Sequence, residues 1–228
     1  MDCHKCELAP SLSPNHVTLV LASIDKWTAH GESLWVLLSA NERARADALF
    51  FAEKRVQSIV SRGLLRLVLG RTLDVNPADL KFVYGQAGKP AIEPTLNPAC
   101  IQFNVSHSGG YWLGAFTLGR EVGVDIERIR EVDDLLALSQ PVIAPANISA
   151  FLQSNRAQQE RLFFEQWTRA EALAKLTGAG IFASTHLQHE RTANKNSRAV
   201  HSFQPLDGYQ AALAVDADEM LHITQLYF

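Results

Sequence analysis

The order of the expected elements along this chain fits an α+β protein built from two related halves. Two segments, 56–68 and 160–176, have the apolar spacing of long helices, and single helices alternate with strands in hairpin order. Ser61-Arg62 in the first helix has a counterpart in Thr168-Arg169 in the second. A Gly-Tyr strand follows each helix, as GYWLGAF at 110–116 and GYQAALA at 208–214. The repeated order predicts two similar halves that divide near residue 119.

The N-terminal half is expected at 17–118, after a flexible tail at 1–16. Apolar residues recur without a miss through the first long helix, and Gly70 stands near its expected end. The other expected elements of this half are strands at 16–23, 33–38, 80–84 and 101–105 and a helix at 41–51.

The C-terminal half is expected at 119–228. Its first strand, 121–127, is predicted to pair antiparallel with the preceding strand, 111–118, through Gly119-Arg120. A polar, partly helical region (128–158) precedes the second long helix, which ends in Gly178-Ala179-Gly180. The last two strands are expected at 208–215 and 221–227.

Composition limits the classes of protein that the chain can represent. The 228 residues carry a net charge of −3, so composition does not suggest a nucleic-acid partner. No apolar run approaches the roughly 20 residues of a membrane span, and the N-terminus has no apolar secretory segment. Three cysteines, an odd and low number, indicate a reducing cytoplasm. Cys3 and Cys6 form a C-x-x-C in a Ser/Pro-rich tail, which fits either a redox or metal role or a frayed terminus.

Three acidic residues carry the main chemical signal. Asp125 and Glu127 lie on one face of the strand in GVDIE, and Glu171 shares a helix face with Lys175. Where the two faces meet, three carboxylates and an ammonium group converge. Carboxylate oxygens suit Mg²⁺, which proteins often hold together with substrate phosphates, so the set indicates chemistry on a phosphate. Taken separately, the pairs also fit a polar strand face and a surface ion pair.

A second group of residues suits an anion. Ser106, His107 and Ser108 follow a strand and precede two glycines, and their hydroxyl, imidazole and backbone N–H groups can donate to anionic oxygens. The alternative is a solvated turn. Gly88-Lys89-Pro90 fits an ordinary turn or a lysine near a phosphate. Arg43, Arg45 and Arg55 fit a solvated helix face or an anion cradle. Neither serine lies in a G-x-S-x-G sequence, which argues against a serine hydrolase.

Four motifs in order carry a family resemblance: GKP, FNVSHS, GVDIE and FFEQWTRAEALAKLTGAG. Together they resemble the broad-range 4′-phosphopantetheinyl transferases, which activate peptide and polyketide synthetases. The resemblance runs from about residue 38 to 215. It implies the family's α+β fold, in which two halves related by a pseudo-twofold each pack an antiparallel sheet on a long helix, and it implies a monomer.

The resemblance also implies a reaction. The family moves the 4′-phosphopantetheine arm of coenzyme A onto a serine of an apo carrier protein, requires Mg²⁺ and releases adenosine 3′,5′-bisphosphate. The implied roles follow motif position. Metal binding falls to Asp125, Glu127 and Glu171, catalysis to Glu171 as base and to Lys175, and coenzyme A binding to Ser106, His107, Gly88, Lys89, Pro90, Arg45 and Arg43.

The carrier protein is expected to meet the segment from Gly178 to about Arg198. Nearby basic side chains suit an acidic carrier helix, although they equally fit a solvated loop. They are His186, His189, Arg191, Lys195 and Arg198.

Three positions depart from the family pattern: Ala170 replaces a common Lys, Asn147 a common Glu and Gln57 a common Arg. Ala170 and Asn147 leave open a non-catalytic module that binds coenzyme A or carrier protein on the same fold. The D-x-E and E-x-x-x-K patterns by themselves also fit a different Mg²⁺-dependent phosphohydrolase.

Overall fold

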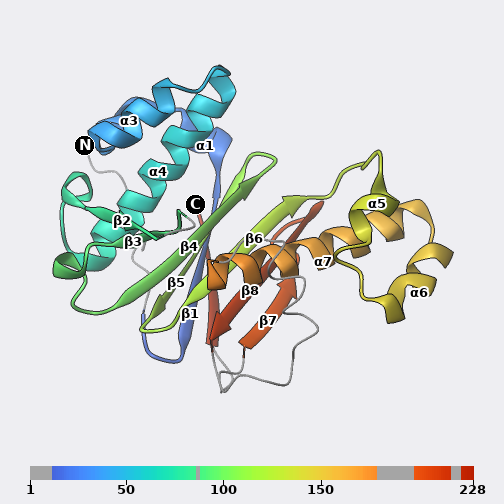
Figure 1. Cartoon of the computed structure of the whole chain (residues 1–228). Helices are drawn as coiled ribbons and strands as arrows, with labels where there is room; N and C mark the ends of the chain where they lie inside the picture. The colour runs from blue at the N-terminus through green and yellow to red at the C-terminus, as the bar shows by residue number, and fades with distance from the viewer. Residues whose placement is uncertain (1–11, 86–87, 179–197, 217–221) are drawn as a thin grey trace.

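The computed structural model describes residues 12–85, 88–178, 198–216 and 222–228. Two sheets pack face to face in this part of the chain, and a long helix covers the outer face of each (Figure 1). The described α-helices are α1 (Ile24–Thr28), α2 (Gly31–Trp35), α3 (Ala40–Asp47), α4 (Ala52–Leu73), α5 (Leu135–Ser139), α6 (Ile148–Gln153) and α7 (Arg156–Thr177). The described strands are β1 (His16–Ser23), β2 (Phe82–Tyr84), β3 (Pro90–Ile92), β4 (Ile101–Ser108), β5 (Tyr111–Leu118), β6 (Val122–Arg128), β7 (Arg198–Phe203), β8 (Tyr209–Asp216) and β9 (His222–Tyr227). The α+β class is confirmed.

The described strands are mainly antiparallel. The first sheet has the order β4-β5-β1-β9, the second has the order β6-β8-β7, and β2 pairs with β3. The parallel pair β1–β9 brings the C-terminal strand into the first sheet. The predicted division at residues 118 and 119 therefore crosses one sheet, and it stays a prediction as a domain boundary.

Alternation along the central strands creates the layers. In β1, Leu19 and Leu21 face the second sheet, whereas Val20 and Ala22 face α4. The β6 residues Val122, Val124 and Ile126 complete the core between the sheets. Their neighbours along β6 therefore face α7, which confirms that Asp125 and Glu127 share one face.

Two features support the repeat seen in the sequence. Helices α4 and α7 each have 22 residues, and each packs on its own sheet. The rings of Tyr111 and Tyr209, one from each Gly-Tyr strand, meet edge to face with centroids 5.2 Å apart. The two corresponding strands, β5 and β8, therefore face each other from different sheets through these tyrosines.

The strand expected at 33–38 is wrong. Helix α2 occupies Gly31–Trp35, and it packs the buried Leu34 side chain onto α4. A Cβ atom on Gly63 would lie 2.7 Å from the Leu34 Cβ, so the missing side chain lets the two helices approach closely. Short apolar runs do not distinguish a strand from a helix, and here this helix contact decided the outcome.

The expected antiparallel pairing of 111–118 with 121–127 is also wrong. Strand β5 pairs with β4 and β1, whereas β6 pairs with β8. Both strands are buried on both faces, so each needs a partner within its own sheet. Arg120 holds the connection by donating to the carbonyls of Pro14 and Asp216 and to the Asn15 side chain.

Gly70 lies near the end of its helix, as predicted, but it is not the capping residue. Helix α4 continues to Leu73 and is capped by Asp74, whose φ is +53°. A Cβ atom on Gly70 would lie 2.7 Å from the Pro77 ring, so this glycine serves close packing of the following segment.

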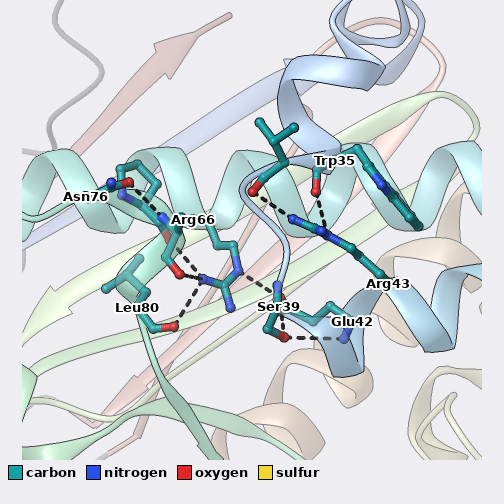
Figure 2. Close-up of polar contacts among 10 residues, drawn as sticks. Trp35, Ser39, Glu42, Arg43, Arg66, Asn76 and Leu80 are labelled. Atoms are coloured by element: carbon teal, nitrogen blue, oxygen red, sulfur yellow. Dashed lines mark hydrogen bonds and ion pairs between the residues drawn. The ribbon is translucent and has the colours of Figure 1, made fainter.

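A buried ion pair stabilises the N-terminal half (Figure 2). The Arg66 Nε lies 2.7 Å from the Glu42 Oε2, and both side chains are almost fully buried. Glu42 also closes the capping box of α3 with Ser39. The Arg66 Nη1 donates to the Pro77 and Leu80 carbonyls. One guanidinium group thus joins α3, α4 and the segment that leads into β2.

Candidate active site

The candidate site lies where β4 of the first sheet meets β6 of the second. Alternate β4 side chains bond to β6. Asn104 accepts a hydrogen bond from the Val124 N–H, Ser106 donates to the Asp125 Oδ1 at 2.7 Å, and Ser108 donates to the Glu127 Oε2 at 2.7 Å. The two halves of the chain therefore build the acidic face together.

Helix α7 crosses this face and adds its own charged residues. Because the cores of both halves hold β6 and α7 in place, Glu171 and Lys175, one helical turn apart, lie over Asp125. The Lys175 Nζ lies 2.6 Å from the Asp125 Oδ1 and 2.9 Å from the Ser106 Oγ. The structure thus brings together the strand acids and the helix pair that the sequence placed on separate elements.

Gly123 permits this crossing. A Cβ atom at this position would lie 2.0 Å from the Ala172 carbonyl oxygen and 2.4 Å from the Leu176 nitrogen. Because both are backbone atoms of α7, no side-chain rotation can relieve the overlap. A glycine at this β6 position is therefore needed to bring Glu171 and Lys175 within reach of Asp125.

We expect Gly123→Ala to displace α7 from β6. The overlap should reduce the free energy of unfolding by at least about 1–3 kcal/mol, the usual range for overpacking, and should also impair the site. Urea unfolding measures the first effect. Gly31→Ala is the comparison variant, because an added Cβ there meets no atom within 4 Å. A Gly123→Ala protein as stable as wild type would contradict the close crossing.

The electrostatics of the site suit proton transfer. Burial raises the pKa of Glu171, and the negative charge of Asp125 raises it further, while Lys175 acts in the opposite direction. Burial also raises the pKa of Glu127, against the hydrogen bond from Ser108. A carboxylate with a raised pKa accepts a proton more readily than an ordinary glutamate does.

A cavity of about 240 Å³ adjoins the helix pair. It is bounded by α7, by β4 and by the segment before β3, and its lining includes Gly88, Lys89, Asn104, Glu171 and Lys175. Lys89 and Gly178 also line a neighbouring cavity of about 620 Å³. Lys89 and Lys175 therefore face one hollow from the two halves.

Lys89 has a structural task at this boundary. Its ammonium lies 2.7 Å from the Glu121 Oε2 and donates to the Val122 carbonyl at 3.1 Å. Pro90 follows as the first residue of β3, which pairs with β2. Sequence reasoning assigned Glu121 no functional role, because its only signal was a charge at the first position of an expected strand.

His107 faces away from the acids, since it alternates with Ser106 along β4. The residue is exposed, but neighbouring protein partly desolvates the imidazole, and this desolvation is the main cause that lowers its pKa. The positive charges of Lys175 and Lys54 lower the pKa further. The neutral imidazole is therefore favoured near pH 7. Lys54, at the start of α4, is a nearby cation that sequence reasoning missed, because an ordinary helix-face lysine gives no signal of its own.

The arginines expected to bind coenzyme A differ in their surroundings. Arg43 donates to the carbonyls of Trp35 and Val36 (Figure 2), which gives it a role in holding α2 against α3. The Arg45 guanidinium lies over the Tyr84 ring, 5.0 Å from its centroid. Arg45 therefore joins α3 to the end of β2, beside the segment that contains Gly88 and Lys89.

The departures from the family pattern can also be placed. Ala170 is fully buried in the core formed by α7 with the segment that contains α5 and α6, so a lysine there would bring an ammonium group into an apolar cluster. Asn147 is exposed next to α6, and Gln57 bonds with Glu53 and Lys54 on α4. The expected carrier segment, apart from Gly178 and Arg198, and the Cys3/Cys6 pair lie outside the described residues.

The donor set fits a divalent cation that substrate oxygens share. In the described ranges, no group of three His, Cys, Asp or Glu side chains is arranged to hold a metal ion by itself. Within the same part of the chain, the Asp125 Oδ2 is buried without a hydrogen-bond partner. Mg²⁺ typically takes one or two protein carboxylates and completes its shell with water and phosphate oxygens. Asp125 has the chemistry for such a site.

Sequence comparisons decide the family. The chain is 33% identical to the 4′-phosphopantetheinyl transferase HetI of Nostoc over 171 residues, which cover 75% of this chain and 72% of that protein. This chain belongs to the 4′-phosphopantetheinyl transferase family. The superfamily model matches residues 121–217, and a model of the N-terminal part of a 4′-phosphopantetheinyl transferase matches residues 25–117.

Two further relatives support the assignment. The chain is 26% identical to the 4′-phosphopantetheinyl transferase Sfp of Bacillus subtilis, over 66% of this chain and 64% of that protein. It is 35% identical to AcpT of Salmonella typhimurium, over 51% of this chain and 58% of that protein. This protein is accordingly a transferase by family.

None of its described helices combines the length and apolar character needed to cross a membrane.

Proposed function

We propose that this protein transfers the 4′-phosphopantetheine arm of coenzyme A to a serine of an apo carrier protein, peptidyl or acyl, in a Mg²⁺-dependent reaction. The observation that carries the proposal is the convergence of Asp125, Glu127, Glu171 and Lys175, from two elements that belong to the motifs shared with the family. Glu171 and Lys175 also line the smaller cavity. The relatives named above are all 4′-phosphopantetheinyl transferases.

In the proposed reaction, the carrier serine oxygen forms a bond to the phosphorus on the pantetheine side of the pyrophosphate. The bond to adenosine 3′,5′-bisphosphate breaks, and this group leaves. The serine proton goes to the Glu171 carboxylate, directly or through one water. A bound cation would lower the pKa of Glu171, so the route through a water is the easier one. Lys175 supplies positive charge where negative charge develops on the leaving oxygen.

Mg²⁺ would be held by Asp125, Glu127 and Glu171 together with the pyrophosphate. When bound, it supplies a Lewis acid that polarises the phosphoryl oxygens. The chain's own residues orient the site: Ser106 and Lys175 hold one oxygen of Asp125, and the other oxygen is left available. The proposed coenzyme A contacts remain Arg45, Gly88, Lys89, Pro90, Ser106 and His107. Arg43 is the weakest candidate, because its guanidinium group already donates to two backbone carbonyls.

Intact-protein mass spectrometry tests the function. An apo peptidyl carrier and an apo acyl carrier are each incubated with the protein, coenzyme A and Mg²⁺. We expect a gain of one phosphopantetheine, lost when EDTA replaces Mg²⁺. No gain on several carriers, with coenzyme A binding intact by calorimetry, would overturn the transferase proposal in favour of a binding module. Release of free phosphopantetheine without a carrier would indicate a phosphohydrolase.

The non-catalytic alternative loses part of its motivation in the structure. The Ala170 side chain packs in an apolar core rather than beside Asp125. A small apolar residue at this position is therefore explained by packing. The monomeric state and the cytoplasmic location are part of the proposal. Size-exclusion chromatography with light scattering tests the former.

Coenzyme A binding is expected to take up a proton at His107. The free protein keeps this imidazole neutral near pH 7, whereas nearby phosphates would favour the imidazolium form. Uptake then occurs between the pKa of the free protein and that of the complex, so affinity falls as pH rises through the latter. Calorimetry in buffers of different ionisation enthalpy measures it. His107→Asn should abolish the uptake and His201→Gln, on β7, should not; equal uptake in both variants would contradict the assignment.

A further inference from the structure

The Ser108 hydroxyl group links the two halves at Glu127. It donates to the Glu127 Oε2 at 2.7 Å and accepts the Arg128 backbone N–H at 3.2 Å. A serine hydroxyl has one proton, and here that proton is committed to the carboxylate. Because the same oxygen is held by the β6 backbone, Ser108 cannot turn freely, and its bond restricts the orientation of Glu127.

The hydrogen bond from Ser108 to Glu127 belongs to a regular set of contacts between β4 and β6. Ser106 and Asn104, two and four residues earlier, also bond across to β6. The contact is thus the last of a row of three that fixes one strand against the other. It lies beside Gly109, where the Tyr209 hydroxyl donates to the backbone carbonyl and ties β8 to the same turn.

We infer that Ser108 is a positioning residue that orients Glu127 for the divalent cation of the transfer reaction. The inference rests on the proposed function, because the cation belongs to it. Ser108 touches neither the cation nor the reacting atoms in this account; it acts through Glu127. The N-terminal half therefore contributes to the metal site of the C-terminal half, in addition to any contact with coenzyme A.

The experiment measures cation affinity directly. Free Mn²⁺ is followed by electron paramagnetic resonance during titration of the full chain with saturating coenzyme A and no carrier. Loss of an outer hydrogen bond to a metal ligand typically weakens affinity by about 10–100-fold, and we expect Ser108→Ala to weaken Mn²⁺ binding within that range. Ser108→Thr retains the hydroxyl and should keep the affinity within about threefold of wild type, clearly less than the loss expected for Ser108→Ala.

A matched control separates positioning from general damage. Thr117→Ala removes a buried hydroxyl on the neighbouring strand β5 that donates to the Arg120 carbonyl, with no carboxylate involved. It should leave Mn²⁺ affinity unchanged. Coenzyme A affinity measured without metal should be the same in all four proteins, because the inference assigns Ser108 no part in that binding.

The outcomes are distinct. Unchanged Mn²⁺ affinity in Ser108→Ala overturns the inference, as does an equal loss of metal-free coenzyme A affinity or a failure of Ser108→Thr to rescue. If Ser108→Ala does not fold, Ser108→Cys replaces it, since a thiol is a weaker donor of similar shape and should give an intermediate loss. Wild-type protein that binds no Mn²⁺ with coenzyme A would instead refute the metal requirement in the proposed function, and this inference with it.

Discussion

Asp125→Asn is expected to reduce phosphopantetheine transfer by on the order of 10²–10³-fold or more, the range seen when one preorganised charge-stabilising group is removed. Asp125 is 3% exposed, and its carboxylate contacts both Lys175 and Ser106. The amide preserves the shape of the side chain but removes the charge. Because this charge is central to the proposed metal site, no other single change in the described site should have a larger effect on activity.

The variant should remain folded, because Lys175 is partly exposed and can turn its ammonium group toward solvent. The rate is measured by carrier mass over time, and folding by circular dichroism and thermal unfolding. Asp207→Asn, which neutralises an exposed carboxylate before β8, is the matched control and should retain full activity. Asp125→Asn protein within tenfold of the wild-type rate would contradict the proposed role of Asp125.

Arg66→Met is expected to produce the largest loss of stability, about 3–5 kcal/mol, the usual effect of breaking a buried ion pair from one side. Glu42 would be left buried without its cationic partner, and the carbonyls of Pro77 and Leu80 would lose their donor. Arg66 lies over the Phe82 ring as well, 5.2 Å from its centroid, so packing is lost together with charge.

Urea unfolding of three proteins tests this expectation. Arg71→Met changes an exposed arginine on the same helix and should cost less than about 1 kcal/mol. Adding Glu42→Gln to Arg66→Met removes the unpaired buried charge, so the double variant should be more stable than Arg66→Met alone. An Arg66→Met protein as stable as the Arg71→Met protein, or a double variant that is no more stable than the single one, would count against the buried pair.

The acidic site was largely predictable because its signals are local. The alternation in GVDIE placed Asp125 and Glu127 on one face, and the four-residue spacing placed Glu171 with Lys175. Periodicity in short segments reflects burial of one face, and both segments are part of a core. Their convergence was a hypothesis from the sequence, and the structure supplies the 2.6 Å contact between Lys175 and Asp125.

Contacts between distant segments could not be predicted. Ser108 and Glu127 lie 19 residues apart, and Lys89 and Glu121 lie 32 apart, yet each pair is in hydrogen-bond contact. The failed pairing of β5 with β6 has the same origin: adjacency in sequence favours a hairpin, but β5 pairs with β4 and β1 while β6 pairs with β8 in the other sheet. Such choices depend on which faces the whole chain can bury at once.

By itself, the sequence determined the α+β class, the two long helices, most of the strands and the residue types of the acidic site, because periodicity and local motifs depend on neighbours in the chain. Only the tertiary structure decided the sheet order, the addition of β9 to the first sheet and the crossing of α7 over Gly123. It also decided which polar groups share partners across the halves. The physical reason is that backbone and side-chain hydrogen bonds between remote segments form only where packing brings their donors and acceptors together.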